Sequence, residues 1–134
     1  MAHKYVLDTH ALVWYLEGNP RLGQDARSVI DDARSELVLP IIALAEAAFI
    51  VEHGRTSIPD VQSLLEAVLA DPRIEIYPLN WEVFQQTLAA LAIPEMHDRQ
   101  IVATALHLRM LGHTTSILTK DGTVIAAALV PIIW

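Results

Sequence analysis

The sequence predicts an α/β fold of three layers, with helices on both faces of a central parallel sheet of four to five strands. Two observations favour this fold. Short apolar runs without polar alternation recur along the chain, which is typical of strands buried on both faces. Between these runs lie stretches with helical spacing of apolar residues, bounded by Pro, Gly or Asn. Strands that alternate with helices indicate parallel pairing, and 134 residues suit one domain that spans residues 1–134.

Five short segments are the expected strands, and helical stretches separate them; the segment at 74–77 alternates between apolar and polar side chains. The strands are expected at residues 5–7, 37–39, 74–77, 116–119 and, at the edge of the sheet, 131–134. Helices are expected at residues 10–17, 23–35, 41–53, 59–70, from 80 onward, at 98–111 and after 122. Glycines end three of these helices, and prolines suit the first turn of two others, at Pro40 and Pro59.

The composition limits the class of protein. Hydrophobic residues make up 53% of the chain, which fits a doubly covered sheet or an apolar surface shared with another subunit. The chain has no cysteine, hence no disulfide and no thiolate metal site, in agreement with a reducing cytoplasm. The first residues have no apolar signal core, and the most apolar window, residues 37–51, is too short for a membrane span. We therefore expect a cytoplasmic protein.

The net charge of −7 is not typical of a protein that binds nucleic acid non-specifically. If the substrate is nucleic acid, we expect few phosphate contacts and a weak dependence of binding on salt.

Two aspartates follow predicted strands. Asp8 comes directly after the first strand, and Asp121 follows the fourth and precedes Gly122. In open α/β sheets, ligands bind in the crevice at the carboxyl ends of the strands, so both are candidate site residues. Each also has an ordinary structural interpretation, Asp8 as a helix N-cap and Asp121 as a turn residue before glycine.

Two further carboxylates are predicted to point inward from helices. Glu46 is the only polar side chain among residues 41–51, and a helix that is apolar all round is buried. A buried carboxylate is costly unless it is paired, protonated or bound to a metal. The alternative is that Glu46 reaches solvent or pairs with one basic residue. Asp98 lies on the apolar stripe of its own helix, although a carboxylate in a first turn also stabilises the helix dipole.

The four carboxylates together predict a metal site. All four can reach the carboxyl edge of one sheet, where their charges would repel one another. A divalent cation would hold them ionised, and ligation by oxygen alone suits Mg²⁺ or Mn²⁺. Such an ion activates water and stabilises the leaving oxygen in phosphodiester cleavage.

Four segments resemble those of PIN-domain ribonucleases, and in particular the VapC toxins of type II toxin–antitoxin pairs. They are residues 5–12, Glu46 within its apolar helix, residues 97–106 and residues 118–121. The most specific is Asp-Arg-x-Ile-Val-Ala-Thr-Ala, which begins at Asp98. The resemblance covers essentially the whole chain, in order, and implies a three-layer PIN-like domain.

The resemblance implies a metal-dependent endoribonuclease toxin that leaves 5′-phosphate and 3′-hydroxyl ends. The catalytic residues and metal ligands would be Asp8, Glu46, Asp98 and Asp121. By analogy Thr119 would support the site through its hydroxyl, and Thr9 and Arg99 are further supporting residues. Arg99 is expected either to pair with a carboxylate or to contact a phosphate. The family often has serine or threonine at the start of the glutamate helix. This chain has Pro40 there, so a hydroxyl contact from that helix is not expected.

The expected partners are an RNA substrate, a cognate VapB-like antitoxin and a second copy of the chain. The acidic crevice suggests an inhibitor that places an arginine in it, from a helix or strand laid in a groove. The apolar excess suggests a homodimer.

Two other functions remain open. A PIN-like module that has lost catalysis would only bind partners, although none of the four carboxylates is missing. An Asp-nucleophile phosphohydrolase of the haloacid-dehalogenase type would need a second aspartate two residues after Asp8, where this chain has His10.

Overall fold

The computed structural model describes residues 3–134, which form one parallel sheet and seven helices. The strands are β1 (His3–Leu7), β2 (Glu36–Pro40), β3 (Ile74–Tyr77), β4 (Thr114–Leu118) and β5 (Ile132–Ile133). The helices are α1 (Thr9–Glu17), α2 (Gln24–Asp31), α3 (Ile41–Glu52), α4 (Val61–Ala70), α5 (Trp81–Thr87), α6 (Met96–Met110) and α7 (Gly122–Ala127). Within the described residues, no helix combines the length and the apolar character needed to cross a membrane.

The sheet has the strand order β3-β2-β1-β4-β5, and every neighbouring pair is parallel. This confirms the predicted α/β class. Strand β1 is central because the chain first adds β2 and β3 on one side and then returns to add β4 and β5 on the other. Such a reversal leaves a crevice at the carboxyl ends of β1 and β4, where open α/β sheets bind ligands.

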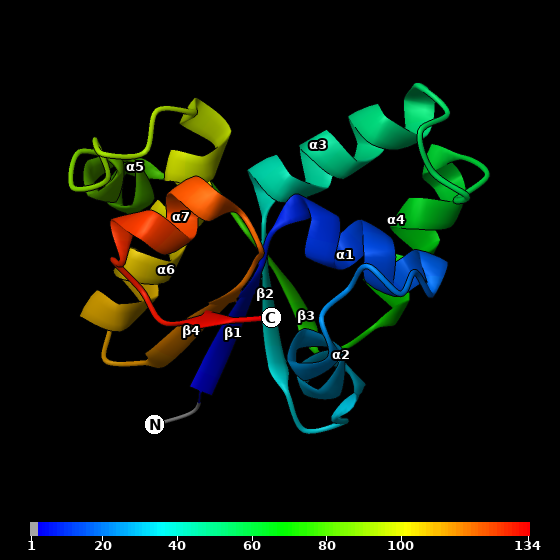
Figure 1. Ribbon diagram of the computed structural model, residues 1–134, viewed down its shortest axis with the longest axis horizontal. Helices are drawn as coiled ribbons and strands as arrows, with labels where there is room; N and C mark the ends of the chain where they lie inside the picture. The colour runs from blue at the N-terminus through cyan, green and yellow to red at the C-terminus, as the bar shows by residue number, and fades with distance from the viewer. Residues whose placement is uncertain (1–2) are drawn as a thin grey trace.

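Helices cover both faces of the sheet (Figure 1). The segment α1 to α4 lies on one side and the segment α5 to α7 on the other, as right-handed crossovers in opposite directions require. Because helices pack on both faces, the central strands have no solvent side. Val6, Leu7, Ile117 and Leu118 are completely buried, which explains why their runs lack polar alternation.

Several element boundaries differ from the predictions. Helix α2 ends at Asp31 because the side chain of Asp32 accepts a hydrogen bond from the backbone of Arg34 and forms a turn. Helix α5 ends at Thr87, so Leu88 and Leu91, which follow it, are exposed on a loop. Helix α6 begins two residues early, at Met96, because Glu95 is its N-cap. The predicted strand at 116–119 lies at 114–118, which leaves Thr119 beyond the sheet edge.

Candidate active site

The four predicted carboxylates line one cavity of about 430 Å³ at the carboxyl edge of the sheet. Asp8 follows β1 and is the N-cap of α1, and Asp121 follows β4 and is the N-cap of α7. Strands β1 and β4 are parallel neighbours, so these two side chains emerge side by side. Asp98 enters from the first turn of α6 and Glu46 from the middle of α3.

The hydroxyl of Thr119 links the two strand ends. It donates a hydrogen bond to Oδ2 of Asp8 and accepts one from the backbone N–H of Asp121 at 3.0 Å. The other oxygen of Asp8 accepts from the N–H of Ala11 at 2.7 Å. Burial raises the pKa of Asp8 above its usual value, although the bonds from Thr119 and Ala11 work in the opposite direction. The N-cap interpretation of Asp8 is therefore confirmed, and the same bonds fix its carboxylate at the cavity wall.

Asp98 and Asp121 have pKa values that are displaced in opposite directions. Burial, followed by the charges of Asp121, Glu95, Glu46 and Asp8, raises the pKa of Asp98 to about 6. Burial would also raise the pKa of Asp121, but hydrogen bonds from Thr123 and Val124 bring it below its usual value. The like charges at Asp98 show that the four carboxylates are close enough to interact, as the sequence predicted.

Glu46 is held by one hydroxyl and one imidazole. Its Oε1 accepts a hydrogen bond from Thr9 at 2.9 Å, and its Oε2 lies 3.2 Å from Nδ1 of His97. The hydroxyl contact to this glutamate thus comes from α1, since Pro40 occupies the start of its own helix. Pairing with one basic residue was the alternative interpretation of Glu46, and the structure shows that pairing.

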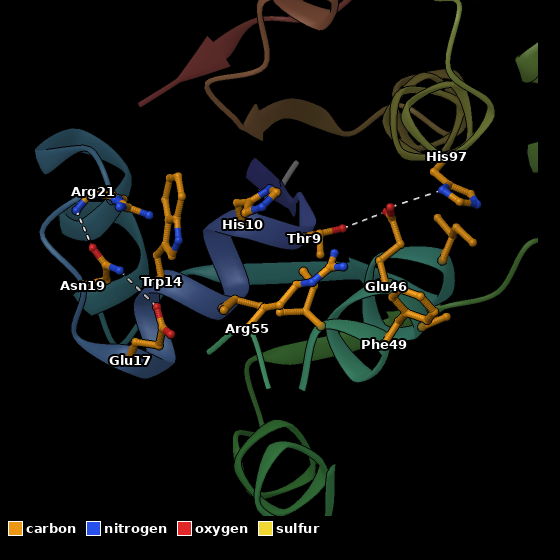
Figure 2. Close-up of a pocket in the computed structure, with 14 residues that line it drawn as sticks. Thr9, His10, Trp14, Glu17, Asn19, Arg21, Glu46, Phe49, Arg55 and His97 are labelled. Carbon is orange, nitrogen blue, oxygen red and sulfur yellow. Dashed lines mark hydrogen bonds and ion pairs between the residues drawn. The ribbon is translucent and has the colours of Figure 1, made fainter. Parts of the chain in front are cut away.

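The expectation that α3 is buried all round is wrong. Only Ala43, Leu44, Ala47 and Val51 are buried, whereas the ring of Phe49 is 53% exposed. The apolar sequence of α3 therefore serves two surfaces: one packs on the core, and the other lines a second cavity beside Glu46 (Figure 2).

The donor set fits a divalent ion, although it is not a preformed ligand cage. Within residues 3–134, no group of three or more His, Asp or Glu side chains is positioned to hold an ion as it stands. The carboxylate of Asp98 and Oδ2 of Asp121 nevertheless accept no hydrogen bond from the described residues. Oxygen ligands of this kind suit Mg²⁺ or Mn²⁺, and a cation would relieve the repulsion that raises the pKa of Asp98.

The predicted supporting residues do not all lie at the cavity. Thr9 and Thr119 contact Glu46 and Asp8 as described. The guanidinium of Arg99 instead donates to the backbone carbonyls of Ile93 and Leu91, and its side chain does not line the cavity. Arg99 therefore holds the loop before α6, and its guanidinium pairs with no carboxylate of the described residues.

Two residues near the cavity were not predicted. Glu95 caps α6 and lies 3.3 Å from Nδ1 of His97. Trp14 lies in the wall of the cavity, with Nζ of Lys120 at 4.6 Å from its ring centroid. The sequence did offer a signal for Glu95, because an acidic side chain directly before a helix can act as its N-cap. It offered none for the contact between Trp14 and Lys120, because these residues lie in distant segments.

Two solved structures share the fold over 96% of this chain. One is the crystal structure of VapBC2 from Rickettsia felis bound to a DNA fragment from their promoter, with 14% identity, a TM-score of 0.67 and 96% of that chain covered. The other is that of FitAcB from Neisseria gonorrhoeae, with 19% identity, a TM-score of 0.65 and 95% of that chain covered. No protein with a curated description matches the sequence significantly.

The sequence profile of the PIN domain matches residues 5–128, which include both strand-end aspartates, Glu46 and Asp98. With this match over most of its length, the chain belongs to the PIN domain family.

Proposed function

We propose that the protein is a metal-dependent endoribonuclease, the toxin of a type II toxin–antitoxin pair. The observation that supports this most is the cavity at the carboxyl ends of β1 and β4, where four carboxylates from four segments meet. Burial and the neighbouring negative charges raise the pKa of Asp98 there. Family membership supports a nuclease activity, and the resemblance to VapC toxins supports RNA as its substrate. We also propose that it acts in the cytoplasm.

The ligands of a divalent ion would be Asp8, Glu46, Asp98 and Asp121. When bound, Mg²⁺ or Mn²⁺ supplies an acidified water and neutralises negative charge on the phosphate. The protein's own part is positioning. Thr119 and the N–H of Ala11 fix both oxygens of Asp8, while Thr9 and His97 fix those of Glu46. The carboxylates of Asp8 and Glu46 are thus held in place. The carboxylate of Asp98 accepts no hydrogen bond from the described residues that would stabilise its charge.

The experiment is cleavage of a labelled RNA in Mg²⁺, Mn²⁺ or EDTA. Asp8→Asn and Asp98→Asn should each abolish cleavage with the fold retained, and activity should require the metal. The matched control is Asp25→Asn, which changes an exposed acid in the first turn of another helix, α2. New ends should be a 5′-phosphate and a 3′-hydroxyl. Cleavage in EDTA by the double variant Asp8→Asn/Asp98→Asn would contradict the proposal, and complete inactivity of the wild type would favour a partner-binding module.

We further propose two binding partners, an antitoxin and a second copy of the chain. The acidic cavity complements a basic side chain, such as an arginine of an inhibitory segment. The structural neighbours support an antitoxin, because one of them is a VapBC assembly. A small antitoxin-like reading frame directly upstream, whose product co-purifies with this chain, would support this part of the proposal.

The proposed homodimer would use the apolar surface around α5. Six large apolar side chains within residues 79–96 are exposed, which is unusual for the free surface of a monomer. They are Leu79, Trp81, Phe84, Leu88, Leu91 and Met96.

A further inference from the structure

A second cavity of about 670 Å³ adjoins the acidic one and shares Thr9, His10, Trp14 and Glu46 with it. It lies between α1 and α3, which leave the sheet edge close together and then diverge (Figure 1). We call this cavity the α1–α3 groove. Its volume is within the range of pockets that hold small organic ligands.

The helical period explains the lining of the groove. Its α1 side chains fall at positions 9, 10, 13, 14 and 17, and its α3 side chains at 42, 45, 46, 49 and 50. Each set is one face of a helix. The segments that follow the two helices add Asn19 and Arg21 at the end of α1 and Arg55 at the end of α3. Figure 2 shows the guanidinium of Arg55 directed into the groove and Arg21 lying beside Trp14.

The unpaired cations of the described chain gather at these two cavities. Six of the nine Lys and Arg side chains have an acidic or carbonyl partner. The three without a hydrogen bond or ion pair within residues 3–134 are Arg21, Arg55 and Lys120. Arg21 and Arg55 line the α1–α3 groove, and Lys120 lines the acidic cavity. In a chain of net charge −7, these three cations are the Lys and Arg side chains left free to meet an anionic ligand.

The two glutamates of the groove form no ion pair with these arginines. Glu17 accepts hydrogen bonds from Thr56, Ser57 and Asn19, and Glu46 is bonded to Thr9 and His97. Since neither carboxylate is paired with Arg21 or Arg55, the guanidinium donors of both arginines remain available for an anionic ligand.

Aromatic rings complete the groove. Trp14 is 9% exposed. Its ring forms cation–π contacts with Lys120, whose Nζ lies 4.6 Å from the ring centroid, and with Arg21, whose Cζ lies 6.0 Å from it. Phe49 is 53% exposed and stacks on His53 with ring centroids 4.0 Å apart. A half-exposed ring that is already supported from one side is a suitable platform for an unstacked base.

We propose that the α1–α3 groove binds single-stranded RNA next to the phosphodiester bond at the acidic cavity. Lys120, Arg21 and Arg55 contact successive backbone phosphates, and Phe49 stacks against one base. This rests on the proposed function, because the acidic cavity defines where the strand must pass. A single strand is the ligand that fits, since a base in a duplex is not free to stack on Phe49.

The test is binding of a short fluorescent single-stranded RNA, measured by anisotropy in EDTA over a range of salt. Each phosphate contact adds about −0.7 to the log–log salt slope for single strands, so three contacts predict about −2. Arg21→Ala and Arg55→Ala should each weaken binding about five-fold near 0.1 M salt and flatten the slope by about 0.7. Phe49→Ala should weaken binding without changing the slope. Circular dichroism melting verifies that each variant is folded.

The matched control is Arg34→Ala, which removes the same charge from an exposed arginine just before β2, at the opposite edge of the sheet. It should bind RNA as the wild type does. Equal affinities for Arg34→Ala and the double variant Arg21→Ala/Arg55→Ala would overturn the proposal and leave the groove to another ligand, such as an acidic protein segment. A duplex of the same sequence that binds as tightly and responds equally to Phe49→Ala would also overturn it.

The binding result is independent of cleavage. If the arginine variants lose affinity but the wild type never cleaves RNA in Mg²⁺ or Mn²⁺, the proposed function fails and the groove assignment stands. If the wild type cleaves RNA and the arginine variants bind unchanged, the groove assignment alone fails.

Discussion

Replacing Asp98 with asparagine should stabilise the metal-free protein at pH 7. The pKa of Asp98 is about 6, raised from 3.8 by burial and by four neighbouring carboxylates. For a fully ionised group this difference corresponds to about 3 kcal/mol of unfavourable free energy at pH 7. Asp98 is only partly buried, so solvent screens part of the repulsion. Loss of the favourable interaction with the α6 dipole reduces the gain further. We expect a net gain of about 1 kcal/mol, or roughly 3–4 °C in melting temperature for a chain of this size.

The pH dependence follows from the direction of the shift. Because the folded-state pKa is raised, the folded protein holds more protons than the unfolded chain between pH 3.8 and about 6. The contribution of Asp98 to stability is complete below 3.8 and is lost as the pH rises through about 6. The wild type should therefore gain stability from this group as the pH falls from 7 to 5 in EDTA, and Asp98→Asn should lack that gain.

The assay is thermal unfolding at pH 7 and pH 5, with EDTA and with excess Mg²⁺ or Mn²⁺. A hundredfold excess of metal over its Kd should stabilise the wild type by about 2.7 kcal/mol per site, and Asp98→Asn should show a smaller response. Asp25→Asn, in the first turn of α2, is the control for helix-dipole effects. The reasoning is refuted if Asp98→Asn melts below the wild type at pH 7 in EDTA, or if metal leaves the wild-type curve unchanged.

Two further predictions concern the Thr119 hydroxyl and the α5 surface. Thr119→Val should lower the free energy of unfolding by about 1–3 kcal/mol and reduce RNA cleavage, because Asp8 and the N–H of Asp121 lose a buried partner. Thr119→Ser keeps the hydroxyl and should retain most of the cleavage activity. Equal losses of cleavage in both variants would argue against a role for the hydroxyl. Leu88→Asp should convert a wild-type dimer into a monomer in sedimentation experiments, whereas Leu69→Asp, at an exposed site on α4, should not; a wild type that stays monomeric at high concentration would exclude the dimer.

Local patterns predicted the parts of the fold that depend on burial. The apolar runs within β1 (residues 5–7) and β2 (residues 37–39), and Ile117 and Leu118 in β4, lie between helices on both faces of the sheet, so each strand was visible without knowledge of its neighbours. Asp8 and Asp121 were predicted as site residues for a related reason, since parallel strands end at one edge.

What the sequence could not predict depends on contacts between distant segments. Residue spacing does not reveal that β1 pairs with β4, and therefore that Thr119 bonds to Asp8. The composition of α3 indicated burial but could not show that one of its faces lines a groove. Likewise, Arg99 follows a candidate carboxylate in sequence, yet its guanidinium turns to carbonyls of the preceding loop.

The central position of β1 has a consequence for synthesis on the ribosome. Asp8 emerges well before its partner Thr119, which lies 111 residues later. A nascent chain that ends within α5 contains Asp8 and Glu46 and lacks Asp98, Asp121 and the strand that pairs with the second edge of β1. For a protein proposed to cut RNA, this order keeps the growing chain harmless to the translation machinery until β4 and Asp121 have been made.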